Sequence, residues 1–145
     1  MRKPYIRYSL PEDENSLIEI IRRSGTGVYH IRDGSIFDLM MEPILVAELD
    51  GKVIGFLVWI QGNRHAYVDT LAVLPEYQKE GVGAWLMHEL GFILHDFGVK
   101  HIFASTLKDE GEPVRNMALR LGYDAIGEFI AVHKYLNGGG VDGRR

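Results

Sequence analysis

Two glycines and a glutamine near the middle of the chain have the spacing of a phosphate-binding turn. They stand as Gln78-x-x-Gly81-x-Gly83, after an apolar, β-favouring run and before apolar residues at helical spacing. Glycine lets a backbone approach a ligand closely, and the free N–H groups of a first helical turn point at that ligand. Because a helix N-terminus carries partial positive charge, this turn favours a phosphate or pyrophosphate group.

The apolar run before the turn also contains side chains that could move a proton. Tyr67 and Asp69 are two residues apart and are therefore expected on one face of a strand, with Leu71 and Val73 continuing that face. A carboxylate at Asp69 could take a proton from an ammonium group, directly or through a water. In a purely structural alternative, Asp69 bonds to a neighbouring turn. Glu76, within the turn, is expected to be solvated.

The pattern along the chain predicts the elements that position these residues. The expected strands are Tyr5–Tyr8, Ile44–Leu49, Val53–Ile60, a strand at 66–74, a strand at 100–106, and one or two strands within 123–136. The expected helices start near Pro11, within 36–40, near Gly83 and at Val114. Asp50-Gly51 between two β-favouring runs predicts a hairpin. Strands that alternate with single helices predict an α/β protein with a mixed sheet.

The motif and its setting resemble the acetyl-CoA-dependent N-acetyltransferase superfamily (GNAT). The resemblance rests on Gln78-x-x-Gly81-x-Gly83 placed after Leu71-Ala72-Val73-x-Pro75, and it extends over Tyr5 to Leu136. It implies one GNAT domain over residues 1–136, followed by a Gly-rich tail at 137–145. The implied fold is a mixed, mostly antiparallel sheet of about six or seven strands flanked by about four helices. The strands at 66–74 and 100–106 are expected to splay apart.

The resemblance also implies which residues bind acetyl-CoA, which would serve as the co-substrate. The pantetheine arm would pair with backbone groups of the strand at Leu71, Ala72 and Val73. The pyrophosphate would lie on the backbone N–H groups of Lys79, Glu80, Gly81, Val82, Gly83 and Ala84. Gln78 stands at a position that the family fills with Gln or Arg, and Arg115 is expected to touch the coenzyme.

The implied reaction is direct attack of a primary amine on the thioester, with Asp69 and Tyr67 as the candidate catalytic residues. One departure from the family concerns the acid that protonates the leaving thiolate. Many members place a Tyr four residues before a Gly-Phe or Gly-Tyr pair; here the pair is Gly122-Tyr123, and the earlier position holds Ala118. Tyr123 itself is expected in the core. Asn116, Ser105 and Thr106 are weak substitutes, and water could protonate a thiolate instead.

The composition of the chain limits the number of domains, the cellular location and the kinds of ligand that are expected. The 145 residues suit one domain, and no apolar run is long enough to span a bilayer. The absence of cysteine excludes disulfides and thiolate metal sites, and with no apolar signal segment it favours the cytoplasm. A net charge of −4 argues against nonspecific nucleic-acid binding and suits a cationic amine. His88 and His95 lack a third ligand, so no metal site is expected.

The acceptor is left open between a small-molecule amine and a peptide amine, and the resemblance admits a homodimer formed through the late strands. The main alternative to an enzyme is a non-catalytic acyl-CoA-binding sensor or interaction module of the same fold. A further alternative is a domain that has lost its ligand and serves only in assembly.

Trp59 and Trp85 lie among apolar neighbours and are expected to anchor the core.

Overall fold

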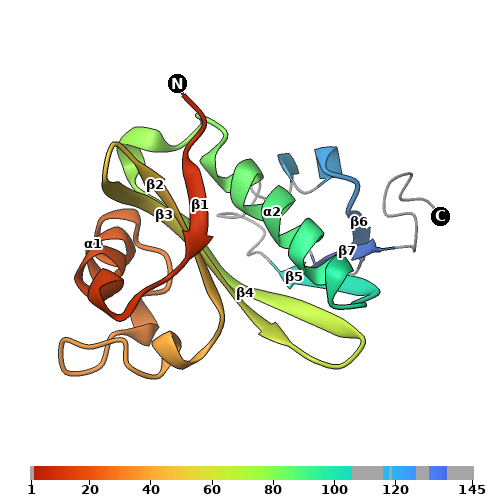
Figure 1. Ribbon diagram of the computed structural model, residues 1–145, viewed down its shortest axis with the longest axis horizontal. Helices are drawn as coiled ribbons and strands as arrows, with labels where there is room; N and C mark the ends of the chain where they lie inside the picture. Colours follow the sequence, from red (N-terminus) through yellow and green to blue (C-terminus); the bar gives the residue numbers. More distant parts are fainter. Residues whose placement is uncertain (1, 106–115, 118, 127–130, 137–145) are drawn as a thin grey trace. The chain divides into compact units, whose positions relative to one another are not determined.

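The structure is a computed structural model, and it describes residues 2–105, 116–117, 119–126 and 131–136. The chain divides into two compact units. The first unit contains Met1–Trp59 and Thr70–Glu89, and the second contains Ile60–Asp69 and Leu90–Arg145. Strands β3 (Lys52–Gln61) and β4 (His65–Val73) and helix α2 (Val82–Asp96) run from one unit into the other (Figure 1).

The first unit begins with an antiparallel sheet of β1 (Tyr5–Tyr8), β2 (Ile44–Leu49) and β3. The turn between β2 and β3 has positive φ at both central residues, 52° at Asp50 and 79° at Gly51. Such a turn matches the right-handed twist of the two strands, which confirms the predicted hairpin.

Trp59, only 1% exposed, is the largest fully buried side chain among the described residues, so its predicted role as a core anchor is confirmed.

Helix α1 (Glu14–Ser24) follows a 3-10 turn, η1 (Pro11–Asp13). Proline at the start and acids in the first turn favour this beginning, and Gly25 ends the helix in the left-handed conformation with φ of 76°. The face predicted to be apolar is buried, and it consists of Leu17, Ile18, Ile20 and Ile21. The prediction for this helix is confirmed.

The segment between Thr26 and Met41 contains no α-helix, so the short helix predicted within 36–40 is wrong. Only two 3-10 turns form, η2 (Val28–His30) and η3 (Leu39–Met41). The N–H of Met40 bonds to the Ile36 carbonyl at 3.0 Å, but the chain is already extended at Glu42, so only a single turn forms.

This segment, residues 26–41, is nevertheless held firmly in place. The carboxylate oxygen Oε2 of Glu14 accepts hydrogen bonds from the Ser35 hydroxyl (2.9 Å) and the Ile36 N–H (3.0 Å). These bonds keep the pKa of Glu14 below its ordinary value, the backbone N–H of Ile36 having the larger effect. Ile36 and Leu39 are buried. Between these attachment points, large apolar side chains are exposed: Val28, Tyr29, Phe37 and Met41.

In the second unit, β4 pairs in parallel with β5 (His101–Ser105), and β5 pairs antiparallel with β7 (Ala131–Tyr135). Strand β6 (Asp124–Ile126) lies antiparallel to β7. The strand order is β1-β2-β3-β4-β5-β7-β6, so the predicted mixed sheet of six or seven strands is confirmed for the described part of the chain. Among the described residues, the ladder between β4 and β5 extends from His65 and His101 to Val68 and Ala104.

The prediction of about four helices is too high, because the described residues form two long α-helices. Residues 116–117 and 119–120 are also helical, within the helix predicted from Val114. Helix α2 starts one residue before the predicted start, and Gly98 lies just beyond its end with φ of 78°. No helix of the described residues is long and apolar enough to cross a membrane.

The expectation that Trp85 anchors the core is wrong. Helix α2 buries Val82, Leu86, Met87, Leu90 and Leu94. Trp85 is 37% exposed, because it lies away from that buried stripe. Lys3 places its Nζ 4.3 Å from the centre of the Trp85 ring, which gives the exposed indole a cation–π contact.

Candidate functional site

The residues of the glycine turn lie together at one end of α2, inside the first unit. Strand β4 ends at Val73, the 3-10 turn η4 (Pro75–Tyr77) follows, and α2 begins at Val82. Buried Leu74 fixes the start of this connection, and its N–H donates to the Ile54 carbonyl at 2.9 Å. The turn therefore begins from a rigid strand end.

The side chain of Gln78 closes the turn. Its Nε2 donates a hydrogen bond to the carbonyl of Val73 at 3.0 Å, which joins the last residue of β4 to the residue after η4. The Gln side chain therefore has a structural role in shaping the loop. It also occupies one acceptor position on Val73, a residue whose backbone was expected to face the coenzyme.

An ion pair holds the outside of the turn against α1. Both guanidinium nitrogens of Arg23 reach the carboxylate of Glu76, at 3.0 and 2.7 Å. The hydrogen bonds from Arg23 hold the pKa of Glu76 below its ordinary value. Since Glu76 is paired, it has a role in positioning the turn beyond the solvated one predicted for it.

The backbone between Gln78 and α2 has an unusual conformation. Lys79 and Gly81 have φ of 68° and 89°, and residues 79–81 are exposed. A Cβ added at Gly81 would have no protein atom within 4 Å, so its positive φ and open surroundings, rather than crowding, call for glycine there.

The first α-helical hydrogen bond of this turn runs from the N–H of Trp85 to the carbonyl of Gly81, at 3.0 Å. The backbone N–H groups of Val82, Gly83 and Ala84 precede that bond and have no partner inside the helix. They point out of the helix N-terminus next to the open space at Gly81. A row of N–H groups with partial positive charge beside an accessible glycine suits a phosphate oxygen.

Strand β4 carries the candidate acid–base residues. Exposure alternates along it as predicted: Val68, Thr70 and Ala72 are buried, Tyr67 is exposed, and Asp69 is half-buried. Leu71 and Val73 are half-buried too. Residues 65–69 of β4 belong to the second unit, and residues 70–73 belong to the first.

The structure adds a pair that the sequence did not suggest. The Nε2 of His30, in η2, lies 2.9 Å from the hydroxyl oxygen of buried Thr70. A Cβ at Gly27 would come within 3.2 Å of the His30 ring, so a glycine is needed beside it. The ring of Tyr29 lies against the ring of His30, with centres 4.2 Å apart. His30 and Thr70 are 40 positions apart, so no local sequence pattern indicates their contact.

Thr106, a weak substitute for the acid, lies outside the described residues, as do Arg115, expected to touch the coenzyme, and Ala118, at the position where many family members have the acid. Asn116 is exposed. Tyr123 is 4% exposed, and burial raises its pKa, so the prediction that it belongs to the core is confirmed. No group of three or more His, Cys, Asp or Glu side chains in the described part of the chain could hold a metal ion.

Residues 15–123 match the model of the acetyltransferase (GNAT) family. This match covers most of the chain, so the chain belongs to the GNAT acetyltransferase family. The resemblance inferred from the glycine motif is thereby confirmed. A search of curated protein sequences finds no match.

Solved structures with the same fold are numerous but distant in sequence. The ribosomal-protein-S18-alanine N-acetyltransferase of Escherichia coli superposes with a TM-score of 0.74 at 17% identity, covering 89% of this chain and 90% of that one. Ard1 of Thermoplasma volcanium gives a TM-score of 0.78 at 20% identity, over 92% and 98% of the two chains. The PaiA N-acetyltransferase of Thermoplasma acidophilum, solved with coenzyme A, gives 0.69 at 19% identity, over 90% and 99%.

Proposed function

We propose that this protein transfers an acetyl group from acetyl-CoA to a primary amine. The observation that carries the proposal is the start of α2, where outward N–H groups adjoin the open, left-handed Gly81. These residues fit a pyrophosphate, because each N–H can donate to a phosphate oxygen and no side chain fills the space. The PaiA relative was solved in complex with coenzyme A, which supports this choice of ligand.

The proposed coenzyme site takes its groups mainly from the backbone. The N–H groups of residues 79–84 would bind the pyrophosphate, and the backbone of Leu71, Ala72 and Val73 would pair with the pantetheine arm. Because Gln78 already donates to the Val73 carbonyl, we assign Gln78 to shaping the loop rather than to direct contact. Arg115 stays a proposed contact from outside the described residues.

Lys79 would add a positive charge outside the phosphates, and this gives a first prediction. Lys79→Gly removes that charge but also relieves the positive φ of 68°. We expect the free energy of unfolding to stay the same or rise by up to ~1 kcal/mol. Affinity for coenzyme A should fall about two- to five-fold, with a larger loss at low ionic strength.

Calorimetric titration with coenzyme A measures this affinity, and chemical denaturation measures the stability. Asp33→Gly is the matched control, because Asp33 also has positive φ, 52°, and lies outside the proposed site. An equal loss of affinity in both variants would show that backbone relief, rather than the lost charge, causes it.

In the proposed reaction the acceptor enters as an ammonium and must lose a proton. Asp69 would take that proton directly or through a water, and Tyr67 would assist on the same strand. The neutral amine then attacks the thioester carbon, the C–S bond breaks, and the coenzyme leaves as a thiolate. The new C–N nitrogen loses its extra proton to water while water protonates the thiolate, so the products are the amide and the free thiol. A backbone N–H near Leu71 would hold the carbonyl oxygen.

Asp69→Asn tests the proposed base. We expect kcat/KM for the acceptor to fall by about 10²-fold or more at neutral pH, with coenzyme affinity unchanged. Activity should recover partly at alkaline pH, where more of the amine is already neutral. The measurement is thiol release from acetyl-CoA across a panel of small and peptide amines, with a no-amine control for hydrolysis. Asp96→Asn, at a carboxylate that is 87% exposed on α2, is the control and should leave the rate unchanged.

The main rival is an acyl-CoA-binding protein without turnover, favoured by Ala118 standing where many members of the family have the acid. The thiol-release assay with the panel of amines distinguishes the enzyme from this rival. The rival predicts that the coenzyme binds but that no amine causes thiol release. The acceptor is proposed to be a small-molecule or peptide amine. A cytoplasmic location and a homodimer stay predictions.

A further inference from the structure

One face of the sheet in the second unit carries a group of aromatic and imidazole rings, here called the ring surface. It consists of His65 and Tyr67 on β4, His101 and Phe103 on β5, and Tyr135 on β7. The strand register places them in two rows, His65 beside His101 beside Tyr135, and Tyr67 beside Phe103, which is in turn beside His133 of β7. Residues in register on neighbouring strands share a face of a sheet.

The distances between the rings agree with that register. The ring centres of His101 and Tyr135 are 5.1 Å apart, and those of His101 and Phe103 are 6.2 Å apart. The His65 ring meets the Phe103 ring edge-on at 6.3 Å. Four of the five rings therefore form one continuous group across three strands, and Tyr67 lies beside Phe103 in the register.

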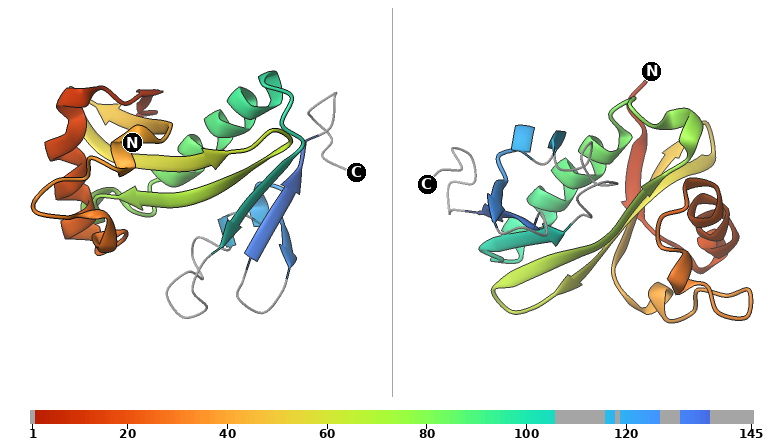
Figure 2. Two further views of the ribbon diagram at one scale, coloured as in Figure 1. Left: turned by 90° about the horizontal axis from the view of Figure 1, so that it is seen from below. Right: turned by 180° about the vertical axis from the view of Figure 1, so that it is seen from behind.

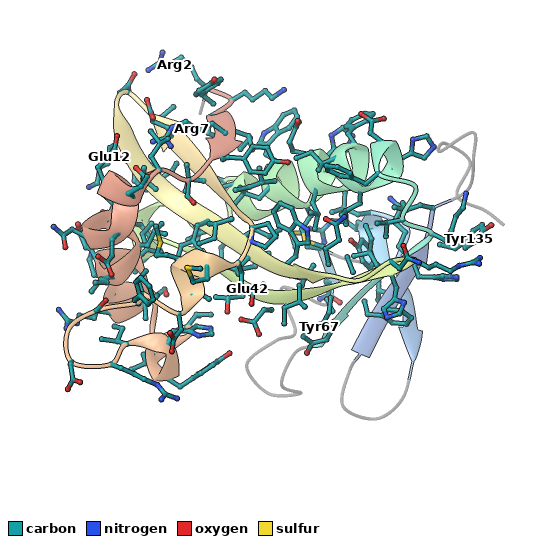
Figure 3. All side chains as sticks on the ribbon, turned by 60° about the horizontal axis from the view of Figure 1, so that its bottom comes forward. Arg2, Arg7, Glu12, Glu42, Tyr67 and Tyr135 are labelled. Carbon is teal, nitrogen blue, oxygen red and sulfur yellow. The ribbon has the colours of Figure 1, made fainter. Side chains whose placement is uncertain are left out.

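The two faces of this part of the sheet differ in burial. The alternate residues, Ala66, Val68, Ile102 and Ala104, are buried, and Figure 2 shows the second half of α2 along one side of β5 and β7. On the ring surface, Tyr67 is 39% exposed and Tyr135 is 40% exposed. Figure 3 shows these two tyrosine side chains extending away from the ribbon. Both tyrosines are thus partly exposed to solvent, while His101 and Phe103 are half-buried.

The chemistry of the ring surface favours a cation. The faces of phenol and phenyl rings carry negative electrostatic potential and attract ammonium groups. The surface includes no lysine and no arginine, and the next exposed-side position on β4 after Tyr67 is the carboxylate of Asp69. All five of its side chains are rings. Two imidazoles and two phenol hydroxyls make it a poor apolar contact for a second copy of the chain.

The length of the surface suggests a short, linear ligand. Asp69 and His65 are four residues apart on one strand, which corresponds to about 13 Å. An amine held at Asp69 for acetylation would therefore leave room for a second ammonium group, several ångströms away, over the rings.

We propose that the ring surface binds the acceptor and selects linear amines that carry two or more positive charges. This inference rests on the proposed function for its assignment of Asp69, but the binding that it predicts does not depend on turnover. The rings hold the distal ammonium groups by cation–π contacts while the terminal amine lies at Asp69.

Calorimetric titration of the full chain, in the presence of coenzyme A, provides the test. The probes are spermine, a linear tetraamine, and butylamine, which has one charge. We expect spermine to bind at least about ten-fold more tightly. Phe103→Leu and Tyr135→Leu keep an apolar side chain but remove the π face, and each should weaken spermine binding about three- to ten-fold. Phe92→Leu, at a ring on α2 that is 60% exposed, should change nothing.

The possible outcomes separate this inference from the proposed function. Equal affinity for spermine and butylamine, or unchanged spermine affinity in both ring variants, would overturn the inference even if thiol release with other amines supported the enzyme. Spermine binding that is lost in the ring variants would support the inference even if no amine released thiol. Tighter binding of phenethylamine than of spermine would overturn it in favour of an apolar acceptor. If Phe103→Leu fails to fold, Tyr135→Leu alone decides.

Discussion

Replacing Gly81 with valine should abolish coenzyme binding while leaving a folded protein. The Cβ at this position would enter the open space at the start of α2, where the phosphates are proposed to lie. We expect the dissociation constant for coenzyme A to rise about 100-fold or more, since the added side chain and the phosphate oxygens cannot share that space. The positive φ of 89° also makes the substitution costly in stability, by about 1–2 kcal/mol.

Gly98→Val separates the loss of coenzyme affinity from the loss of stability. Gly98 follows the opposite end of the same helix, has φ of 78°, and likewise has no protein atom within 4 Å of an added Cβ. Both variants should lose similar stability in chemical denaturation, but only Gly81→Val should lose coenzyme affinity in calorimetry. If Gly81→Val still bound coenzyme A normally, the proposed placement of the phosphates would be wrong. The corresponding alanine pair is available if valine prevents folding.

Arg7→Ala should be among the most destabilising substitutions in the first unit. The guanidinium of Arg7 makes two hydrogen bonds to the carboxylate of Asp13, at 2.9 and 3.1 Å, and its Nε donates to Glu48 at 2.9 Å. Asp13 is 6% exposed and also accepts the N–H of Leu10 at 2.7 Å. Removing Arg7 leaves a buried carboxylate without its cation, which costs about 3–5 kcal/mol.

Chemical denaturation near neutral pH measures this loss, and Arg2→Ala is the control. Arg2 pairs with Asp50, but both side chains are more than two-thirds exposed, so we expect a change within about 0.5 kcal/mol. Figure 3 labels the two arginines. Similar losses in the two variants would mean that burial of Asp13 does not control the energy of its ion pair.

The same ion pair predicts a pH dependence of stability. Hydrogen bonds from Arg7 hold the pKa of Asp13 below its ordinary value of 3.8, against the opposing effect of burial. A carboxylate with a lowered pKa in the folded state stabilises fully above its unfolded pKa and loses that contribution as pH falls through the folded value. Stability should therefore decline in acid, and Arg7→Ala should flatten that decline.

Local sequence signals predicted the regular elements well. Pro11 and Gly25 mark the two ends of the first helical region, Asp50-Gly51 makes the hairpin, and Gly98 follows the end of α2. Each of these residues determines the backbone conformation of only a few neighbouring residues in the sequence. Its effect can therefore be inferred without the tertiary structure. The short helix expected within 36–40 was wrong, because the chain is already extended at Glu42 and the bonds to Glu14 hold that segment in place.

Part of the candidate site was predictable because it depends on local sequence signals. The glycine turn is a local feature, and its open backbone lies where the motif indicated. The contacts of His30 with Thr70 and of Arg23 with Glu76 join residues 40 and 53 positions apart, which no local pattern reveals. Trp85 shows the limit of hydrophobicity as a guide, because its neighbours in sequence are apolar but its position on α2 is exposed.

The attachment of residues 26–41 has a consequence for how the protein can change over generations. The backbone of this segment depends on Glu14, on the His30–Thr70 contact and on two buried side chains, whereas Val28, Phe37 and Met41 are exposed. Mutations at the exposed positions therefore leave the attachments intact. Substitutions at these exposed positions can change which molecules the segment binds, while the attached residues keep its fold. Within this short segment, binding and stability therefore depend on different residues.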